Sequence, residues 1–400
     1  MSKLEELIKE FCPDGVEYKR LGDISAISRG GSFQKKDYTE GGVPCIHYGQ
    51  IYTHYGLFAE KTLSYISEET AQKQKFAEHG DVVMAITSEN IDDVCKCIAW
   101  LGNEKVAVSG HTAIIHHCIN SKYLVYWLHS AMFYEQKIKI AHGTKVIEIA
   151  PAKLADVILP VPPIPVQEEI VRILDSFTEL TAELTAELTA RKKQYEYYRD
   201  RVIDLESIGY QKIKLGEICD VRDGTHDSPK AVPKGKYLIT SKNIKNGTID
   251  YLGAYFISEE DYNKINYRSK VDVWDILFTM IGTIGEIGLI TFEPDFAIKN
   301  VGLIKTHDEL LARFLKHYLL SEQVKKYIKE NQSKGSQSFL ALGKLRDLPV
   351  PLISKEKMKF LVQVLDNFDS ICSNLKIGLP AEIEARRKQY EFYRDKIMAF

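Results

Sequence analysis

The longest regular pattern of apolar residues in the chain lies between Val166 and Leu205. Leucines recur every four residues within the run T-E-L-T-A-E-L-T-A-E-L-T-A (178–190), and apolar residues at three- and four-residue steps continue the pattern on both sides, uninterrupted by Gly or Pro. The stretch therefore predicts one helix of about 40 residues, or roughly 60 Å. A helix this long needs a partner with a matching apolar stripe, and we expect Leu180, Leu184 and Leu188 to form the contact seam.

A second copy of the end of this helix occurs half a chain later. Residues 190–201 read A-R-K-K-Q-Y-E-Y-Y-R-D-R, and residues 385–396 read A-R-R-K-Q-Y-E-F-Y-R-D-K, with conservative mismatches only. So distinctive a string predicts an internal duplication in which each half ends in a long helix. Gly378 and Pro380 precede the second copy and predict a break or kink there.

The segments that precede the helices have a different pattern, with short apolar runs between Gly- and Pro-rich turns. Each begins with a similar string (Leu21–Ile24 and Leu215–Ile218), continues through a polar Gly-rich loop, short strands and a short helix, and ends in a proline-rich hinge. The predicted fold is α/β (α+β): two β-rich modules alternate with two long helices, which pack as an antiparallel coiled-coil spacer with pseudo-two-fold duplication. The predicted bounds are 1–160, 161–208, 209–352 and 353–400.

Composition limits the classes of function. The net charge is −2, so a nucleic-acid binder of this composition would need local basic patches. The seven cysteines include no C-x-x-C pair, which favours reduced thiols, and His116-His117-Cys118 lacks a second spaced pair, so we expect no metal site. With no signal-peptide pattern and no apolar segment of membrane-spanning length, we expect a cytoplasmic protein without a membrane partner.

Sequence motifs for catalysis are missing. There is no G-x-x-x-x-G-K-[ST] phosphate loop and no N-P-P-[YF] or D-P-P-[YF] methyltransferase motif, and the glycines of 282–288 do not have the dinucleotide-binding spacing. We therefore expect this chain to contain no catalytic residues.

The arrangement resembles a known family. Two dissimilar modules alternate with two similar helices, each entered from a proline-rich hinge and closed by the repeated R-[KR]-K-Q-Y-E-[YF]-Y-R-D string. This resembles the specificity (S) subunit of type I restriction–modification enzymes, and the T-A-E-L run is similar to the spacer repeats of one branch. The resemblance implies that the modules are target recognition domains, each reading one half of a bipartite, asymmetric double-stranded DNA site, and that the helices are the two conserved regions. It also implies two docked methyltransferase (M) subunits, joined by restriction motor–nuclease (R) subunits. S-adenosylmethionine, ATP and Mg are expected in those partners and no cofactor in this chain.

The candidate DNA contacts are polar side chains on matching loops of the two modules. Arg and Lys suit guanine or phosphate, and Gln and Asn suit adenine. As sets, the loops are stronger candidates than any single residue, because polar loops are solvated by default. The candidates are Arg29, Ser32, Gln34, Lys35, Lys36, His47, Tyr48, Gln50, Tyr52 and Lys145 in the first module, and Arg222, Thr225, His226, Ser228, Lys230, Ser241, Lys242, Asn243, Lys245, Gln337 and Ser338 in the second.

The tetrapeptide repeat suits a spacer. One T-A-E-L unit adds about 6 Å and a net rotation near 40°, whereas one DNA base pair adds about 3.4 Å and about 34–36°. The alternative is that the repeat is an ordinary surface helix repeat and the chain is a coiled-coil protein-interaction scaffold that does not bind DNA. A DNA reader would differ from such a scaffold by gathering Lys and Arg on the module faces. Two readings also stay open for the repeated string: Arg199 and Arg394 could pair with nearby acids or face a methyltransferase subunit.

Overall fold

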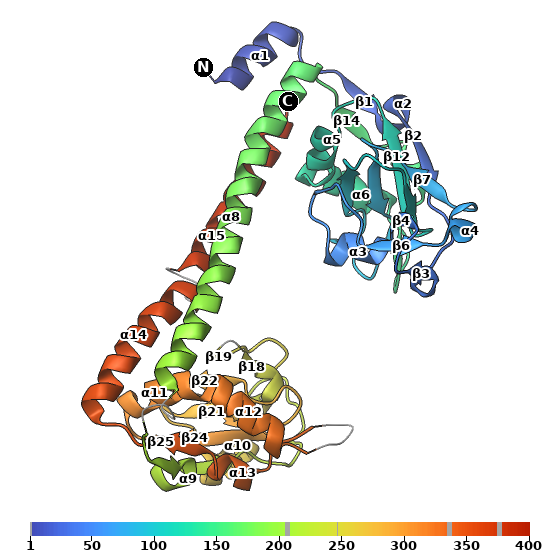
Figure 1. The fold of residues 1–400 in the computed structure, drawn as a ribbon. Coiled ribbons are helices and arrows are strands. Elements are labelled where there is room, and N and C mark those ends of the chain that lie inside the picture. The colour runs from blue at the N-terminus through green and yellow to red at the C-terminus, as the bar shows by residue number, and fades with distance from the viewer. Residues whose placement is uncertain (1, 205–208, 246, 334–337, 374–377) are drawn as a thin grey trace. The chain divides into compact units, whose positions relative to one another are not determined.

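The computed structural model describes residues 2–204, 209–245, 247–333, 338–373 and 378–400. The chain divides into two compact units, one formed by residues 1–183 and 383–400 and the other by residues 184–382. Each unit contains one β-rich domain and one pair of helix segments (Figure 1). The 40-residue helix α8 (Ile164–Ile203) contributes its first half to unit 1 and its second half to unit 2.

The domain of unit 1 is built on two five-stranded sheets, ordered β2-β12-β8-β10-β5 and β3-β6-β4-β11-β7. Its strands are β1 (Tyr18–Arg20), β2 (Ser25–Arg29), β3 (Tyr38–Thr39), β4 (Val43–Ile46), β5 (Phe58–Ala59), β6 (Ser64–Ile66), β7 (Lys75–Ala77), β8 (Val82–Ala85), β9 (Thr87–Ser88), β10 (Cys97–Trp100), β11 (Val106–Val108), β12 (Thr112–His117), β13 (Ile147–Glu148) and β14 (Ile158–Pro160). Its helices are α1 (Lys3–Phe11), α2 (Leu21–Ile24), η1 (Lys35–Asp37), α3 (Tyr48–Thr53), α4 (Glu68–Ala71), α5 (Ser121–Leu128), α6 (Ala131–Ile140) and α7 (Pro151–Leu154).

The domain of unit 2 repeats this plan with shorter sheets, ordered β16-β24-β21-β22 and β20-β17-β23. Its strands are β15 (Lys212–Lys214), β16 (Asp220–Asp223), β17 (Lys236–Ile239), β18 (Ile244–Lys245), β19 (Thr248–Ile249), β20 (Tyr255–Ile257), β21 (Ile276–Thr279), β22 (Ile287–Leu289), β23 (Phe296–Ile298), β24 (Val301–Lys305) and β25 (Pro349–Pro351). Its helices are α9 (Leu215–Ile218), η3 (Ser241–Asn243), α10 (Glu259–Ser269), α11 (Glu309–Leu319), α12 (Glu322–Asn331) and α13 (Leu342–Arg346). In both domains the second sheet contains one parallel pair, β4–β11 and β17–β23.

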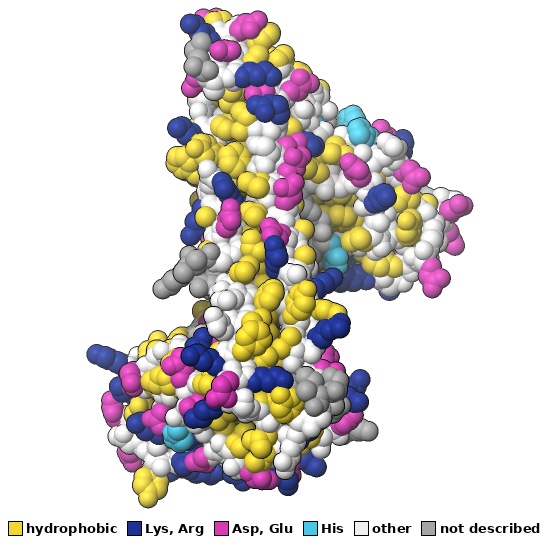
Figure 2. Space-filling view, turned by 60° about the vertical axis from the view of Figure 1, so that its left-hand side comes forward, with side chains coloured by type: hydrophobic (Ala, Val, Ile, Leu, Met, Phe, Trp, Pro, Cys, Tyr) yellow, Lys and Arg dark blue, Asp and Glu magenta, His cyan; other side chains and the backbone are white. Residues whose placement is uncertain are grey.

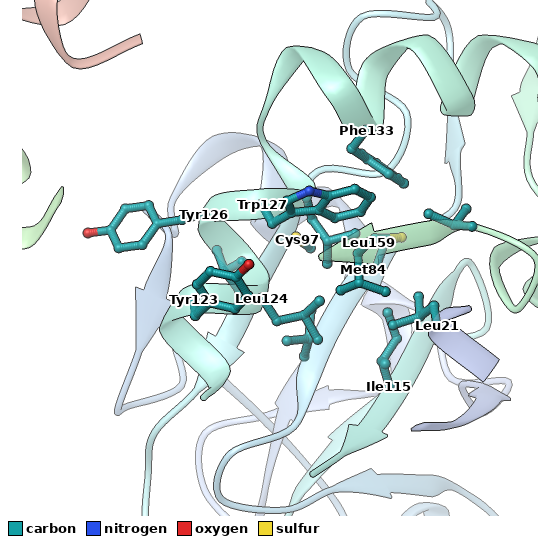
Figure 3. Close-up of a cluster of buried hydrophobic side chains, with 14 of the residues drawn as sticks. Leu21, Met84, Cys97, Ile115, Tyr123, Leu124, Tyr126, Trp127, Phe133 and Leu159 are labelled. Carbon is teal, nitrogen blue, oxygen red and sulfur yellow. The ribbon is translucent and has the colours of Figure 1, made fainter. Parts of the chain in front are cut away.

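The central strands explain why the two sheets stay together. All four residues of β8 are buried, and Val82 and Met84 belong to one core while Val83 and Ala85 belong to another. Because side chains alternate across a strand, an apolar run of this kind is covered on both faces. The first core continues through Trp127 and its neighbours on α5 and α6 (Figure 3). The internal duplication predicted from the helices therefore extends to the β-rich domains.

The helix pairs are antiparallel within each unit. In unit 1, Phe177 of α8 stacks on Tyr393 of α15 (Leu379–Met398), with ring centroids 5.5 Å apart, and earlier α8 residues share a core with Met398. In unit 2, Tyr198 of α8 stacks on Phe368 of α14 (Lys355–Ser373) at 5.7 Å. The prediction of a break near Gly378 is confirmed, because α14 and α15 are separate helices and Pro380 lies in the first turn of α15, where proline is tolerated.

The seam of α8 does not follow the leucines alone. Leu184 and Leu188 are half-buried, but Leu180 is 36% exposed. A four-residue step turns a helix by about 400°, so successive leucines drift about 40° around the axis. The half-buried Thr181 lies where the leucine row has moved off the contact face. Leu180 is therefore less covered than Leu184 and Leu188, and its place in the seam stays a prediction.

Each domain is fastened to its helix pair by a polar joint at the same place in both units. In unit 2, His317 of α11 is fully buried; its Nδ1 lies 2.7 Å from the Tyr195 hydroxyl and its Nε2 lies 2.7 Å from an Asp366 carboxylate oxygen. Arg313 also donates to Asp366. In unit 1, the Tyr126 hydroxyl donates to Asp175 at 2.6 Å. The duplication thus preserves the joint while exchanging its side chains.

The repeated string supplies part of this joint. Arg199 is buried, pairs with Asp200 at 3.1 Å and lies over the Tyr195 ring. Arg394 pairs with its own neighbour Asp395 at 2.9 Å. Asp200 accepts the backbone N–H of Glu322 at 3.1 Å, and Asp395 that of Ala131 at 3.1 Å, so each carboxylate holds the first turn of a domain helix. Of the two readings left open for these arginines, the structure shows the acid pairing.

Candidate nucleic-acid interface

A Gly-rich loop and a tight turn are joined by backbone hydrogen bonds in the domain of unit 2. The loop follows β16 and the turn connects β23 to β24. Gly224 N–H donates to Val301 O at 2.9 Å, Thr225 N–H to Ile298 O at 3.0 Å, and Asn300 N–H to Thr225 O at 3.1 Å. A Cβ atom on Gly224 would lie 2.4 Å from Ile298 O, so only glycine permits this approach.

The same frame occurs in the domain of unit 1. Gly30 N–H donates to Thr112 O at 3.0 Å and Gly31 N–H to Val108 O at 2.6 Å, and a Cβ on Gly30 would lie 2.2 Å from Ser109 O. The predicted Gly-rich loops therefore lie beside a turn that sequence reasoning did not single out, Ser109–His111 in one domain and Lys299–Asn300 in the other. The available signal was a strand–turn–strand pattern present at this place in both halves.

Several predicted residues of unit 1 gather at this frame. The His47 and Tyr48 rings lie 4.5 Å apart between centroids, and Tyr48 lies 5.0 Å from His111 of the turn. Tyr52 packs edge-on against Tyr48 at 6.5 Å. Burial lowers the pKa of His47, and the nearby positive charges of Lys35 and His111 lower it further. The cluster is thus an aromatic platform with a neutral imidazole at its base.

Other predicted residues of unit 1 have internal bonds. Gln50 is buried; its carbonyl accepts from His47 N–H at 2.9 Å, and its amide donates to Ser64 at 2.8 Å. Arg29 donates to Gly110 O and pairs with Glu148, both at 2.8 Å. These contacts support a structural role for Gln50, whereas the remaining predicted residues lie on the surface. The exposed ones are Ser32, Gln34, Lys35, Lys36 and Lys145.

In unit 2 a chain of polar contacts leads from α10 to the turn. Arg268 pairs with Asp223, whose other oxygen lies 2.9 Å from His226 Nε2. His226 Nδ1 lies 2.8 Å from the side-chain oxygen Oδ1 of Asn300. Lys299 donates to Ser228. The loop and α10 border an open pocket of about 690 Å³ whose lining includes Thr225, His226, Ser228 and Lys230.

The other predicted residues of unit 2 divide into buried and exposed groups. Asn243 is buried; its carbonyl oxygen accepts from Thr240 N–H at 3.0 Å and its amide donates to Asp250 O at 3.0 Å. It therefore occupies the same capping position as Gln50 in unit 1. Arg222 pairs with Asp220, which also raises its pKa. Lys242 and Lys245 are exposed, Ser241 and Ser338 are half-buried, and Gln337 lies outside the described residues.

Two further properties bear on the kind of site. Among the residues that the structure describes, no group of three or more His, Cys, Asp or Glu side chains is arranged to hold a metal ion. Within the same part of the chain, no helix combines the length and apolar character needed to cross a membrane.

Comparison with known proteins identifies the family. Residues 13–191 and 207–385 match the type I restriction modification DNA specificity domain. The chain is 28% identical over 424 residues to the type I restriction enzyme EcoR124I/EcoR124II specificity subunit of Escherichia coli, covering 100% of this chain and 97% of that one. It is 31% identical over 309 residues to a putative type I specificity subunit of Mycoplasma pneumoniae, covering 72% and 84%.

Solved structures share the fold. A chain solved in a study of complex assembly and conformational transition of the type I R-M system aligns with a TM-score of 0.58 at 16% identity, covering 96% of this chain and 98% of that one. The S subunit of the type I restriction–modification system of M. genitalium aligns with a TM-score of 0.50 at 14% identity, covering 96% and 97%. The chain therefore belongs to the DNA specificity subunits of type I restriction–modification systems, the non-catalytic subunits that carry two target recognition domains.

Proposed function

We propose that this chain reads a bipartite, asymmetric DNA site, with residues 1–160 reading one half and residues 209–352 the other. The observation that supports it is the duplicated frame: the same Gly-rich loop is bonded to the same turn in both domains, yet the side chains differ. In unit 1 the frame carries the aromatic rings of Tyr48 and His111, whereas in unit 2 it carries the amide of Asn300 and the imidazole of His226. A constant backbone with different side chains is what two readers of different base sequences require.

We further propose that residues 161–208 and 353–400 set the distance between the half-sites. Helix α8 runs without interruption through the whole T-A-E-L repeat. Removing one unit shortens it by about 6 Å and turns its far end by about 40°. On B-form DNA this matches a shift of one to two base pairs and leaves the distal domain facing the groove. A deletion of one to three residues would turn the domain away from the duplex.

The same helices are proposed to dock two methyltransferase subunits, to which restriction motor–nuclease subunits attach. Figure 2 shows apolar side chains at the surface of the long helices, interleaved with charges of both signs. Tyr197 and Phe392, at equivalent positions of the repeated string, are 55% and 62% exposed, and Phe360 is 64% exposed. Exposed aromatic residues are typical of protein interfaces. In this assignment S-adenosylmethionine, ATP and Mg belong to the partner subunits.

The alternative is a coiled-coil scaffold that binds proteins but not DNA, with the exposed aromatics of the helices as its binding surface. The two functions differ at the domain loops, because only a DNA reader needs basic and hydrogen-bonding side chains there. The exposed Lys35 and Lys36 of unit 1 and Lys242 and Lys245 of unit 2, all on predicted contact loops, favour the reader.

The test is methylome sequencing of cells that express this chain with its cognate methyltransferase subunit. We compare it with a variant that lacks Thr185–Leu188 and with a control that lacks only Thr185–Glu187. We expect methyladenine in a split motif, a shorter gap with unchanged half-sites in the four-residue deletion, and loss of methylation in the three-residue deletion. A stable complex without any methylation motif would refute DNA reading, and an unchanged gap in the four-residue deletion would refute the spacer.

A further inference from the structure

We propose that Arg222, Arg268 and Arg346 form a pocket that holds one backbone phosphate of the DNA bound by the domain of unit 2. This assignment rests on the proposed function and adds to it a site that positions the duplex without reading its bases. Neither Arg268 nor Arg346 lies in the loops predicted from the sequence.

The three arginines come from different elements and border one open pocket of about 480 Å³, together with Asp220 and Tyr267. Arg222 lies on the edge strand β16, Arg268 near the end of α10, and Arg346 at the end of α13. Three arginines against one aspartate give the lining a net charge of +2. A phosphate group suits this lining, because a guanidinium group binds two of its oxygens at once. Tyr267, which is 94% exposed, adds a hydroxyl donor.

The guanidinium groups are held in place before any ligand binds. Arg346 donates from Nε and Nη2 to Val221 O at 3.0 and 2.8 Å, and Arg222 donates from Nη1 to Arg268 O at 2.8 Å. Arg268 pairs through Nη2 with the buried Asp223. Each guanidinium carries five N–H donors, and the Nη1 groups of Arg268 and Arg346 have no hydrogen-bond partner among the described residues. Side chains held in this way lose little conformational entropy when an anion binds.

The duplication shows that the frame folds without an arginine at position 346. In unit 2, a Cβ atom on Gly216 of α9 would lie 3.1 Å from the Cβ of Arg346. In unit 1, a Cβ atom on Gly22 of α2 would lie 2.9 Å from the Cβ of Ala155. Ala155 therefore occupies the position of Arg346, and the same close contact between two short helices forms with an alanine.

The other two arginines are also particular to unit 2. Ser28 stands two residues before the glycine of the loop in unit 1, where Arg222 stands in unit 2. The helix that would carry a counterpart of Arg268 has four residues in unit 1 (α4) and eleven in unit 2 (α10). The phosphate contact is therefore expected at one half-site and not at the other.

The pocket adjoins the Gly-rich loop that is proposed to read DNA. Arg268 borders both this pocket and the pocket along the loop, whose lining holds three acidic and three basic residues and is less positive. Arg222 precedes Thr225 by three residues, or about 10 Å of extended chain. The major groove of B-form DNA is about 12 Å wide. When the loop lies in the groove, a phosphate at the edge of the groove is thus at the distance of the pocket.

The experiment measures binding of the purified complex of this chain with its cognate methyltransferase subunit to a duplex that contains the methylation site, at several salt concentrations. It compares wild type with Arg346→Ala and Arg346→Lys, and Lys344→Ala is the control. Lys344 is exposed on the same helix α13 but does not line the pocket, so its removal changes the net charge equally.

We expect Arg346→Ala to weaken binding roughly tenfold at 0.1 M salt and to reduce the slope of log K against log salt by about 0.9, the effect of one phosphate contact. The methylation motif stays unchanged, because phosphate contacts carry no base specificity. Arg346→Lys loses the two-nitrogen contact with Val221 O but keeps the charge, so the slope is retained. Lys344→Ala leaves affinity and slope as in wild type.

A second measurement locates the contact. In a series of duplexes, one phosphate at a time is replaced by an uncharged methylphosphonate. We expect one position beside a half-site at which wild type loses affinity and Arg346→Ala loses no more. If Arg346→Ala does not form the complex, Arg222→Ser takes its place with the same expected results, since serine is the residue of unit 1 at that position.

The outcomes separate the pocket from the function on which it rests. Absence of any methylation motif with the wild-type chain would remove the proposed function. A wild-type motif together with an unchanged slope for Arg346→Ala would overturn the pocket and keep the proposed function. Equal loss of slope in Arg346→Ala and Arg346→Lys would show a structural role only and overturn it as well. An unchanged slope with weakened binding of the methyltransferase subunit would assign the pocket to an acidic protein segment, and an unchanged slope with stabilisation by inorganic phosphate would assign it to a free anion; both overturn the DNA contact.

Discussion

We predict that removing one tyrosine hydroxyl from the joint between domain and helices destabilises unit 2 more than unit 1. Tyr195→Phe removes the hydroxyl that donates to His317 Nδ1. His317 is fully buried, burial lowers its pKa, and its other nitrogen is bonded to Asp366, so the ring is neutral and Nδ1 needs a donor. Tyr390→Phe removes the equivalent hydroxyl of unit 1, which is buried next to Arg394 and has no counterpart of His317 as a partner among the described residues.

The magnitudes follow from these environments. A buried acceptor left without a donor costs about 1–3 kcal/mol. For a unit of this size, that lowers the Tm of its transition by about 2–4 °C for each kcal/mol. The hydroxyl of Tyr390 leaves no buried imidazole acceptor behind, so its removal is expected to be neutral within about 0.5 kcal/mol.

Differential scanning calorimetry of the two variants measures the difference. Tyr195→Phe should lower the Tm of one transition, and Tyr390→Phe should leave both in place. Equal shifts for the two variants would refute the reasoning, because the rings occupy equivalent positions of the repeated string and differ in their hydroxyl partners. A Tyr195→Phe variant as stable as wild type would likewise show that His317 finds another donor.

Three further substitutions test the burial and charge of single side chains. Hydrogen bonding to Arg172 and Lys3 outweighs burial and lowers the pKa of Glu169 to about 2 from an ordinary value of 4.5, so its contribution to stability is complete above pH 4.5 and is lost as the pH falls toward 2. Glu169→Gln should flatten this part of an acid-unfolding curve, and an unchanged curve would contradict the assignment. Lys242→Ala should weaken DNA binding at all sequences and reduce the salt dependence of the binding constant by about one counterion. Asn243→Ala should instead destabilise the domain by about 1–3 kcal/mol, because it leaves buried hydrogen-bonding groups without partners. If Asn243→Ala weakened DNA binding without lowering the free energy of unfolding, Asn243 would face DNA.

Local patterns were sufficient for the helices and their duplication. The uninterrupted stretch around the leucine run, the prolines before it and the repeated string at 385–396 depend on near neighbours in sequence, and the structure confirms the helices they predict. The roles of the capping residues depend instead on distant contacts. Gln50 and Asn243 follow a strand in polar sequence, which suits a DNA contact, but their amides close a helical turn inside the domain. Nothing in the neighbouring sequence indicates that the turn folds inward.

The amino-acid sequence by itself determined the repeated order of β-rich domain and long helix, because hydrophobic periodicity, prolines and an internal repeat are properties of adjacent residues. Only the tertiary structure decided which side chains meet. Asn300 and His226 are far apart along the chain, and their contact exists because Gly224 allows the loop to approach the β23–β24 turn. Leu180 is likewise more exposed than Leu184 and Leu188, because a four-residue step turns the helix by about 400° and the position of the partner surface decides how far each leucine is covered.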